Sequence, residues 1–481
     1  MIPVLLVLLP WAVATVAALL PRRAVQEACL AGGAALHLAG TALAWNAPAG
    51  TGADLLGPDP TGLLVLSVVS LVYAACAFYS IGYLRFQRAH RPERPLRFFV
   101  PCLFGALGSL TLACLARHMG LLWIALESAG LCVAPLVYFL RTRLALEATW
   151  KYLVLSAVGV AFGLLGTFFT ALSSVGRTGV VPTLFWPDLV AAGSALSGPW
   201  LQAGFALIVL GYGTKVGFAP LHTWKPDTYG EAPAPVSALL AGASPLCFLL
   251  GILRLHGVLL AAGHGEFAQH VLLAMGVVSV AVGAALVVRQ SDYKRLLAYS
   301  SVEHMGVLAL GFGVGGVAVS AALLHAVGNG LAKTLLFLSL GNVHRDTGTR
   351  QIPDAGGTLA RLPATGALLL VGWAAAVGLP PFPLFQSEVG LLRGMFDSGQ
   401  GVLAAFLLVA LAISFAGLSA GLLGVVFGAP PPDRPRPARR VALFVVPSAV
   451  LALLLVGLGV FLPEVFSDAL RSASASLGGP P

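Results

Sequence analysis

The sequence predicts an all-α integral membrane protein with about fourteen transmembrane helices. Hydrophobic residues make up 58% of the 481 residues and charged residues only 10%, whereas soluble proteins carry about 25% charged residues. Most of the chain must therefore lie in lipid. Two further observations support this fold class: apolar runs recur at membrane-spanning length, and the basic residues are distributed unevenly between the loops.

Each apolar run has about the 20 residues that a helix needs to cross the hydrocarbon core. In chain order the expected spans cover residues 1–20, 28–45, 61–84, 99–116, 119–140, 150–174, 199–221, 234–257, 266–288, 296–316, 318–341, 363–396, 401–428 and 441–462. No basic residue precedes the first run, and Arg22 and Arg23 follow it. We therefore interpret this run as a span and not as a cleaved signal peptide.

The basic residues predict the orientation of the spans. Most of the 28 Lys and Arg residues fall in loops that follow odd-numbered spans. These residues are Arg22, Arg23, Arg85, Arg88, Arg91, Arg94, Arg97, Arg141, Arg143, Lys151, Lys225, Arg289, Lys294, Arg295, Arg345, Arg350, Arg361, Arg434, Arg436, Arg439 and Arg440. By the positive-inside rule these loops are cytoplasmic and both termini face outward. The net charge of +9 is thus a topology signal and does not indicate nucleic-acid binding.

We place seven of the ionisable residues at bilayer depth within the expected spans. They are Glu127, Lys215, Glu303, His304, His325, Lys333 and Glu388. A charged group at bilayer depth costs at least about 2.5 kcal/mol on insertion scales and usually faces a bundle interior or a wet path. A structural ion pair is the alternative for each. Glu303 and His304 lie close to the expected cytoplasmic end of their span, which leaves both interpretations open for them.

The eleventh span carries a polar stripe in the segment HAVGNGLAKTLLF. His325, Asn329 and Lys333 stand at i, i+4 and i+8, which places them along one helix face. Histidine can pass protons near neutral pH, so this face is suited to a proton relay. A polar stripe that joins two helices is the alternative interpretation.

Two spans contain helix breaks, GFAPLHTW in the seventh and GLPPFPLFQSE in the twelfth. Proline frees backbone groups that only protein or a water-filled cavity can satisfy. One break follows Lys215 and the other precedes Glu388, and His222 and Asp227 follow the first break to cap or position it. The breaks lie five spans apart, so we expect two inverted five-helix repeats. The expected organisation is an N-terminal three-helix segment (1–98), repeats 99–257 and 266–428, and a loop with helix fourteen (429–481).

Several motifs carry a family resemblance. The stretches KVGFAPLHTWKPDTYGEAPAPVSALLAG (215–242), DYKRLLAYSSVEHMG (292–306), HAVGNGLAKTLLF (325–337) and GLPPFPLFQSE (378–388) resemble the proton-translocating, antiporter-like subunits of respiratory complex I, Mrp antiporters and energy-converting hydrogenases. The resemblance runs from span four to span twelve. SSVEHMG and the PPF segment are most similar to the F-type subunit of hydrogenase-4 (formate hydrogenlyase).

The resemblance implies roles for individual residues. Glu127 and Lys215 match a coupled glutamate–lysine pair, and His325 and Lys333 match a central relay. Glu388 falls where the family has a distal lysine or glutamate. Protons would enter from the cytoplasm, pass along this central axis and leave outward. The supporting residues of the expected path are His222, Asp227, Glu303, His304, Asn329 and Tyr212.

The sequence also departs from the family pattern. A second lysine, expected in span eight, is replaced at about Leu246, and the second histidine of span eleven is Asn329. Tyr229 and Glu231 stand where His and Gln are frequent. Leu246 cannot relay a proton, so a link from Lys215 to Lys333 would need water, or Tyr212, Ser244 or His304.

The resemblance implies a subunit of a redox-driven complex in a bacterial or archaeal cytoplasmic (inner) membrane. Expected partners are other membrane-arm subunits, a peripheral redox arm and lipid, with iron–sulfur, nickel–iron or flavin centres only in partner subunits. No bond chemistry, cofactor or metal site is expected within this chain. The alternatives are a subunit of a sodium/proton antiporter, a membrane subunit of an inorganic-carbon-accumulating complex, and a non-pumping structural subunit.

Overall fold

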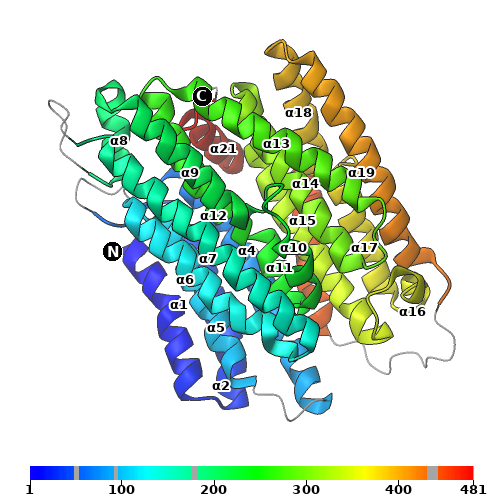
Figure 1. Ribbon diagram of the computed structural model, residues 1–481. Helices are drawn as coiled ribbons and strands as arrows, with labels where there is room; N and C mark the ends of the chain where they lie inside the picture. The colour runs from blue at the N-terminus through cyan, green and yellow to red at the C-terminus, as the bar shows by residue number, and fades with distance from the viewer. Residues whose placement is uncertain (48–53, 91–95, 176–182, 431–441, 480–481) are drawn as a thin grey trace.

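The computed structural model describes residues 1–47, 54–90, 96–175, 183–430 and 442–479. Within these ranges the chain is a bundle of roughly aligned helices that contains no β-strand, only three isolated bridges (Figure 1). The expected all-α membrane fold is confirmed. Seven of the loop arginines lie outside the described residues: Arg91, Arg94, Arg177, Arg434, Arg436, Arg439 and Arg440.

Nine of the described helices are long and apolar enough to cross a membrane, and the number reaches eleven if each of two bent pairs forms one span. The expected count of fourteen is therefore not confirmed. Each expected apolar run does coincide with helix. Two of the helices outside the nine, α9 (Gly198–Val216) and α14 (Tyr293–Val314), carry the buried charged residues Lys215 and Glu303.

The remaining helices follow in chain order. They are α1 (Ile2–Leu19), α2 (Arg23–Ala28), α3 (Ala34–Ala44), α4 (Pro60–His90), α5 (Phe99–Leu115), α6 (Met119–Val137), α7 (Arg143–Leu172), α8 (Trp186–Ala192), α10 (Trp224–Glu231), α11 (Ala234–Gly242), α12 (Ser244–Ala261), α13 (Gly265–Val287), α15 (Val317–Thr347), α16 (Thr358–Arg361), α17 (Pro363–Ala376), α18 (Pro383–Asp397), α19 (Gly401–Phe427), α20 (Val446–Val460) and α21 (Glu464–Ala475).

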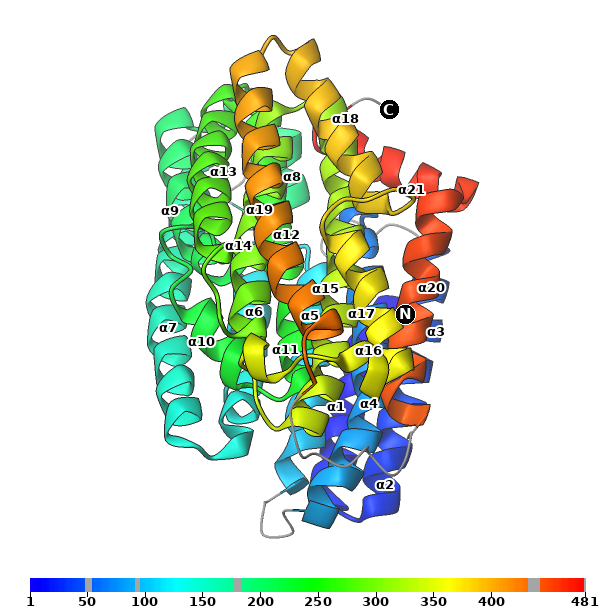
Figure 2. The ribbon, with the colours of Figure 1, turned by 90° about the vertical axis from the view of Figure 1, so that its right-hand side faces the viewer.

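The core of the bundle is formed by α4, α15 and the α11–α12 pair. In the apolar stretch of each of these helices, 83%, 94% and 94% of the residues are buried inside the protein. The corresponding share is 33–39% in α1, α7, α13 and α19. The peripheral helices keep apolar side chains on their outer faces, as expected where lipid is the solvent. The C-terminal helices α20 and α21 lie along one edge and pack against α15 (Figure 2).

Both expected helix breaks are present. Helix α9 ends at Gly217, whose φ of +84° is left-handed and therefore suits glycine, and α10 begins at Trp224. In the second break, α17 ends at Ala376 and α18 begins at Pro383, with Gly378 at φ +67° between them. The prolines and glycines of these two segments thus interrupt the helices inside the bundle, where protein surrounds the freed backbone groups.

Helices α7 and α9 cross at very close range because both present glycines at the contact. A Cβ added to Gly211 of α9 would overlap the backbone of Gly159 and Gly163 on α7. Lys215 lies one helical turn after Gly211 and faces the same neighbour. The glycine contact therefore sets how closely the lysine approaches α7.

We predict that Gly211→Ala lowers the midpoint of thermal unfolding in detergent, followed by tryptophan fluorescence. Overpacking of this kind costs about 1–3 kcal/mol in the free energy of unfolding. Gly457→Ala on α20 is the matched control, because an added Cβ there meets no atom within 4 Å. An unchanged midpoint in Gly211→Ala would contradict the close helix crossing.

Candidate functional site

Lys215 is buried near the end of α9, with a side chain enclosed by aromatic rings. Its Nζ lies 4.0 Å from the ring centroid of Tyr152 on α7 and 5.7 Å from that of Phe248 on α12. A Cβ at Gly130 of α6 would lie 2.8 Å from this Nζ, so the glycine leaves room for it. The ring faces stabilise a cation, and the stabilisation is largest where water is excluded.

Glu127 lies on α6, half-buried, and is the carboxylate that interacts electrostatically with Lys215. The ion pairs of the described residues, defined by N–O distances up to 4.0 Å, do not join these two side chains. The coupled pair that the family resemblance implies is therefore separated in this conformation. Glu127 and Lys215 are neighbours, but the ammonium rests on Tyr152 and not on the carboxylate.

Lys333 lies at the centre of α15 and is completely buried. Its Nζ donates a hydrogen bond of 2.5 Å to Ser300 Oγ on α14. Glu303, one turn further along α14, is its electrostatic partner. Both Glu303 carboxylate oxygens are buried without a hydrogen-bond partner among the described residues. An unpartnered buried carboxyl group is costly, and such groups usually have a functional or hydration role.

A chain of hydrogen bonds crosses three helices beside Lys333. His304 Nδ1 on α14 and His325 Nε2 on α15 share a hydrogen bond of 2.9 Å, and His325 Nδ1 shares another of 2.9 Å with Ser387 Oγ on α18. The chain therefore leads from α14 to the helix that carries Glu388. Glu303 and His304 lie near the middle of α14, because Asp292 caps the helix a full ten residues earlier. Their place in the helix does not give their depth in the membrane, so the expectation that they lie close to the cytoplasmic end of a span stays a prediction.

Asn329 is buried between His325 and Lys333 on α15, and neither its amide nitrogen nor its carbonyl oxygen has a hydrogen-bond partner among the residues described. The predicted stripe is thus buried along its whole length. Its two ends, His325 and Lys333, hydrogen-bond to neighbouring helices, while its middle member carries free hydrogen-bonding capacity that a water could use.

Glu388 lies on α18, one turn inside the helix that follows the second break. A Cβ at Gly378 would overlap its carboxylate, so the side chain folds back over the break. Glu388 interacts electrostatically with Glu303. The two carboxyl groups and Lys333 therefore form one electrostatic group across α14, α15 and α18.

The supporting residues around the first break have different roles. Asp227 on α10 forms ion pairs with Lys151 (2.9 Å) and Arg295 (3.0 Å), which tie the break to α7 and α14. His222 is buried within the break and its Nδ1 has no partner among the described residues. Tyr212 is buried on α9, and its hydroxyl also has no hydrogen-bond partner among the described residues. Its ring packs against Gly163 and Gly251. Asp227 thus holds the break in place, while His222 and Tyr212 point unpartnered polar atoms inward.

Two lysines that the charge pattern assigns to cytoplasmic loops are in fact buried. Lys225 is 0% exposed and Lys294 is 4% exposed. Lys225 Nζ donates to the carbonyl of Val216 at 2.6 Å, and Lys294 Nζ donates to the carbonyl of Ala232 at 2.7 Å. Each lysine is turned inward to satisfy a carbonyl at a helix end, and the expected cytoplasmic side of both stays a prediction. The only sequence signal for such a contact is the position of Lys225 directly after a predicted break, and it does not specify the partner.

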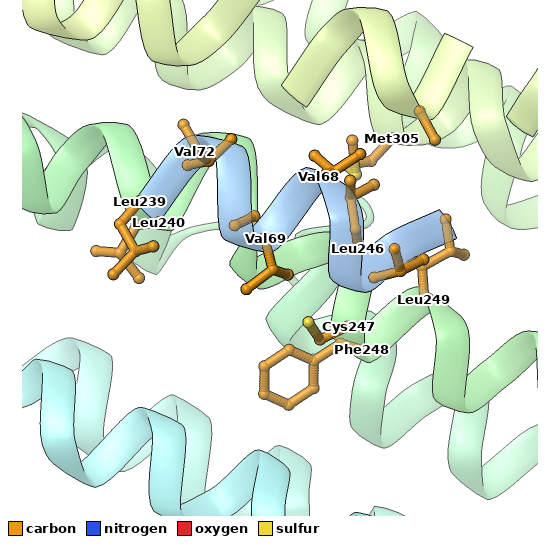
Figure 3. Packing of buried hydrophobic residues seen from close by; sticks show 14 of the residues in the cluster. Val68, Val69, Val72, Leu239, Leu240, Leu246, Cys247, Phe248, Leu249 and Met305 are labelled. Atoms are coloured by element: carbon orange, nitrogen blue, oxygen red, sulfur yellow. The ribbon is translucent and has the colours of Figure 1, made fainter. Parts of the chain in front are cut away.

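The position of the absent family lysine is apolar. Leu246 on α12 is 3% exposed and lies in the buried cluster with Val68 and Met305, as Figure 3 shows. The departures Tyr229 and Glu231 are also accommodated. The Tyr229 hydroxyl donates to the carbonyl of Leu240 at 2.6 Å, and Glu231 forms an ion pair of 2.8 Å with Arg350.

Together these features define a multi-helix membrane protein with broken helices and charged groups buried along its interior, an arrangement typical of ion-translocating proteins. The chain belongs to the NADH:quinone oxidoreductase/Mrp antiporter transmembrane family, whose pattern matches residues 116–414. Within the described part of the chain, no group of three or more His, Cys, Asp or Glu side chains is placed to hold a metal ion.

Relatives support this assignment. The chain is 34% identical to the hydrogenase-4 component F homolog of Methylacidiphilum infernorum over 84% of this chain and 85% of that one. It is 30% identical to NADH-quinone oxidoreductase subunit N of Desulforudis audaxviator over 98% and 97%.

Solved structures share the fold. A chain of the archaeal membrane-bound sulfane sulfur reductase superposes with a TM-score of 0.87, at 23% identity over 99% of this chain and 98% of that one. A chain of respiratory complex I from Thermus thermophilus gives 0.83, at 24% identity over 99% of both.

We predict that Leu246→Lys destabilises the protein. The substitution would place an ammonium group in an apolar cluster, at a cost of roughly 3 kcal/mol on membrane insertion scales. The yield of folded protein and its thermal midpoint in detergent report the effect, with Leu246→Met as the size-matched control. A Leu246→Lys variant as stable as Leu246→Met would show that water or a carboxylate reaches this position.

Proposed function

We propose that this chain is a proton-translocating membrane subunit of a redox-driven complex of the complex I or hydrogenase type. The observation that carries the proposal is the series of ionisable groups inside the bundle, with Lys215 and Lys333 buried and Glu127 and Glu388 half-buried. These groups lie in a chain whose relatives are named as subunits of a hydrogenase and of an NADH-quinone oxidoreductase. The geometry gives no preference to a sodium antiporter, an inorganic-carbon complex or a purely structural subunit.

The first step takes place at Lys215. An ammonium group beside an ionised Glu127 is stabilised by the pair, whereas an unpaired ammonium in an apolar interior is strongly disfavoured relative to the neutral amine. Movement of Glu127 toward or away from Lys215 therefore makes the lysine take up or release a proton. We assign the arrangement in which the Lys215 ammonium lies over the Tyr152 ring, with no ion pair to Glu127 among the described residues, to the separated state of this cycle.

The second half of the path is formed by Lys333, Glu303, His304, His325 and Glu388. A proton that reaches Lys333 has Ser300 as a hydrogen-bond partner and Glu303 as an electrostatic partner. The His304–His325–Ser387 chain then leads to α18, where Glu388 lies just after the second break. Asn329 and a water at its free amide would support the same transfer.

The two broken helices support an inverted-repeat organisation, with residues 99–257 and 266–428 as the copies. In this organisation the break between α9 and α10 corresponds to the break between α17 and α18, and each break has one ionisable residue of the path next to it. Inverted copies of this kind bring two half-channels to a common central axis. On the charge pattern of the loops, both termini face away from the cytoplasm.

The oxidation chemistry belongs to partner subunits in this proposal. The chain would sit in a bacterial or archaeal cytoplasmic membrane, surrounded by lipid and by other membrane-arm subunits. A peripheral arm would hold the iron–sulfur, nickel–iron or flavin centres. The solved structures that share the fold are described as parts of respiratory membrane complexes, which supports assembly of this kind.

Purification of the tagged chain in mild detergent, followed by mass spectrometry, tests the proposed assembly. We expect soluble subunits of a hydrogenase or of a complex I-like enzyme to co-elute with further membrane subunits. Recovery with small membrane subunits and no redox protein would instead indicate an antiporter, and recovery with a cytoplasmic zinc protein would indicate an inorganic-carbon complex.

We predict that Lys215→Ala abolishes coupled proton movement and leaves assembly intact. Inverted membrane vesicles that contain the complex, supplied with the reductant that its soluble subunits oxidise, should no longer quench a pH-gradient dye. Arg393→Ala is the matched control, because its ion pair with Asp397 is exposed and such pairs contribute little. Normal proton uptake in Lys215→Ala would contradict the proposed role of this lysine.

A further inference from the structure

Lys225 is a third buried lysine near the bundle centre, and its surroundings differ from those of a loop residue. It lies in the first turn of α10, immediately after the break, and its side chain is completely buried. Its Nζ donates to the Val216 carbonyl at 2.6 Å and to Ser301 Oγ on α14 at 3.2 Å. The lysine therefore bridges the end of the helix that carries Lys215 and the helix that contacts Lys333.

Lys225 and Lys333 approach the same part of α14 from different sides. Ser301 accepts from Lys225, and the preceding residue, Ser300, accepts from Lys333. The two ammonium groups are close enough to interact electrostatically. Two like charges in a dry interior disfavour one another, so a proton on one lysine opposes a proton on the other. This coupling suits two successive sites of one proton path.

The side chain of Lys225 also packs against the backbone that directly follows Lys215. It lies flat across Gly217, where an added Cβ would come within 2.6 Å of its Cδ, Cε and Nζ. Gly217 is two residues from Lys215. The neighbouring Trp224 donates its indole N–H to the Thr214 carbonyl at 2.7 Å, and its ring lies 5.2 Å from the Tyr152 ring on which Lys215 rests. The backbone of the break therefore holds the two lysines next to the same short segment.

We propose that Lys225 carries protons between Lys215 and Lys333, in place of the polar residue that the chain lacks at Leu246. This inference rests on the proposed proton-translocating function. In each transfer the N–H bond of the donor ammonium breaks and leaves a neutral amine, and the receiving neutral amine becomes an ammonium. Serine hydroxyls and waters on the way accept one proton and release one, so they end unchanged.

A purely structural role for Lys225 is the alternative, because its bond to Val216 satisfies a carbonyl that the break sets free. Lys294 provides the comparison. It is also buried, and its Nζ donates to the carbonyls of Gly230 and Ala232, but within the described part of the chain no serine hydroxyl accepts from it. The two lysines thus share the capping contact, and Lys225 alone of the two has the hydroxyl contact toward the path.

The test compares Lys225→Gln, Lys225→Arg and Lys294→Gln in the full complex. Glutamine keeps a neutral N–H donor for the carbonyl, and arginine keeps the charge and the donors but cannot be deprotonated in a protein. Inverted vesicles report proton uptake by dye quenching and the turnover of the reductant in parallel. We expect both Lys225 variants to lose roughly tenfold or more of the proton uptake per turnover, since positioned proton-transfer groups contribute about 10²–10⁴-fold. Lys294→Gln should retain it.

The outcomes separate the inference from the proposed function. If Lys215→Ala stops proton uptake while Lys225→Gln and Lys225→Arg transport normally, the relay role is overturned and the function stands. If Lys215→Ala itself transports normally, the proposed function fails. Equal losses in Lys225→Gln and Lys294→Gln would assign both lysines to capping.

Ser301→Ala provides a second variant in case the Lys225 substitutions prevent assembly. It removes the hydroxyl that accepts from Lys225 and leaves the contact with Val216 in place. We expect proton uptake per turnover to fall while the amount of purified complex is unchanged. Unchanged proton uptake in an assembled Ser301→Ala complex would overturn the relay role.

Discussion

The site depends on one hydrogen bond, from the ammonium of Lys225 to the carbonyl of Val216. This carbonyl has no partner within α9 because the helix ends there. A helix that stops inside a membrane protein leaves backbone acceptors that lipid cannot satisfy. A buried lysine has the complementary problem, since three donors lie in an apolar interior. Each satisfies the other at 2.6 Å, across a glycine that no larger residue could replace without overlap. The break and the buried charge therefore stabilise one another.

Other buried polar side chains along the interior also find hydrogen-bond partners on neighbouring elements. Lys294 binds the carbonyls at the end of α10, Lys333 binds Ser300, and His325 joins His304 to Ser387. The central axis also contains buried polar atoms that have no hydrogen-bond partner within the described part of the chain. The oxygens of Glu303 and the amide of Asn329 are buried and unpartnered among the described residues. Buried polar groups without a partner also occur away from this axis, for example at Tyr73, His256 and Ser448, so those on the axis support a path only together with the charged residues beside them.

Much of this could be predicted from the sequence. Span-length apolar runs, the two Pro and Gly breaks and the i, i+4, i+8 stripe at His325 each follow from short-range rules, and the structure has a helix or a break at each place. The contacts of Lys225 and Lys294 could not be predicted in this way. Charge counting places a lysine beside a span but cannot say whether its side chain turns outward to water or inward to a carbonyl. The separation of Glu127 from Lys215 likewise depends on how α6, α7 and α9 pack, which no local pattern specifies.

The most direct test of a continuous proton path is a high-resolution electron cryomicroscopy map of the complex in lipid nanodiscs. The decisive feature is the density between Lys215, Lys225 and Lys333. A working path predicts ordered waters that link the three ammonium groups through Ser300 and Ser301 and reach the free amide of Asn329. A dry interior, in which side chains such as Leu246 and Met305 close the gap between the lysines, would contradict it.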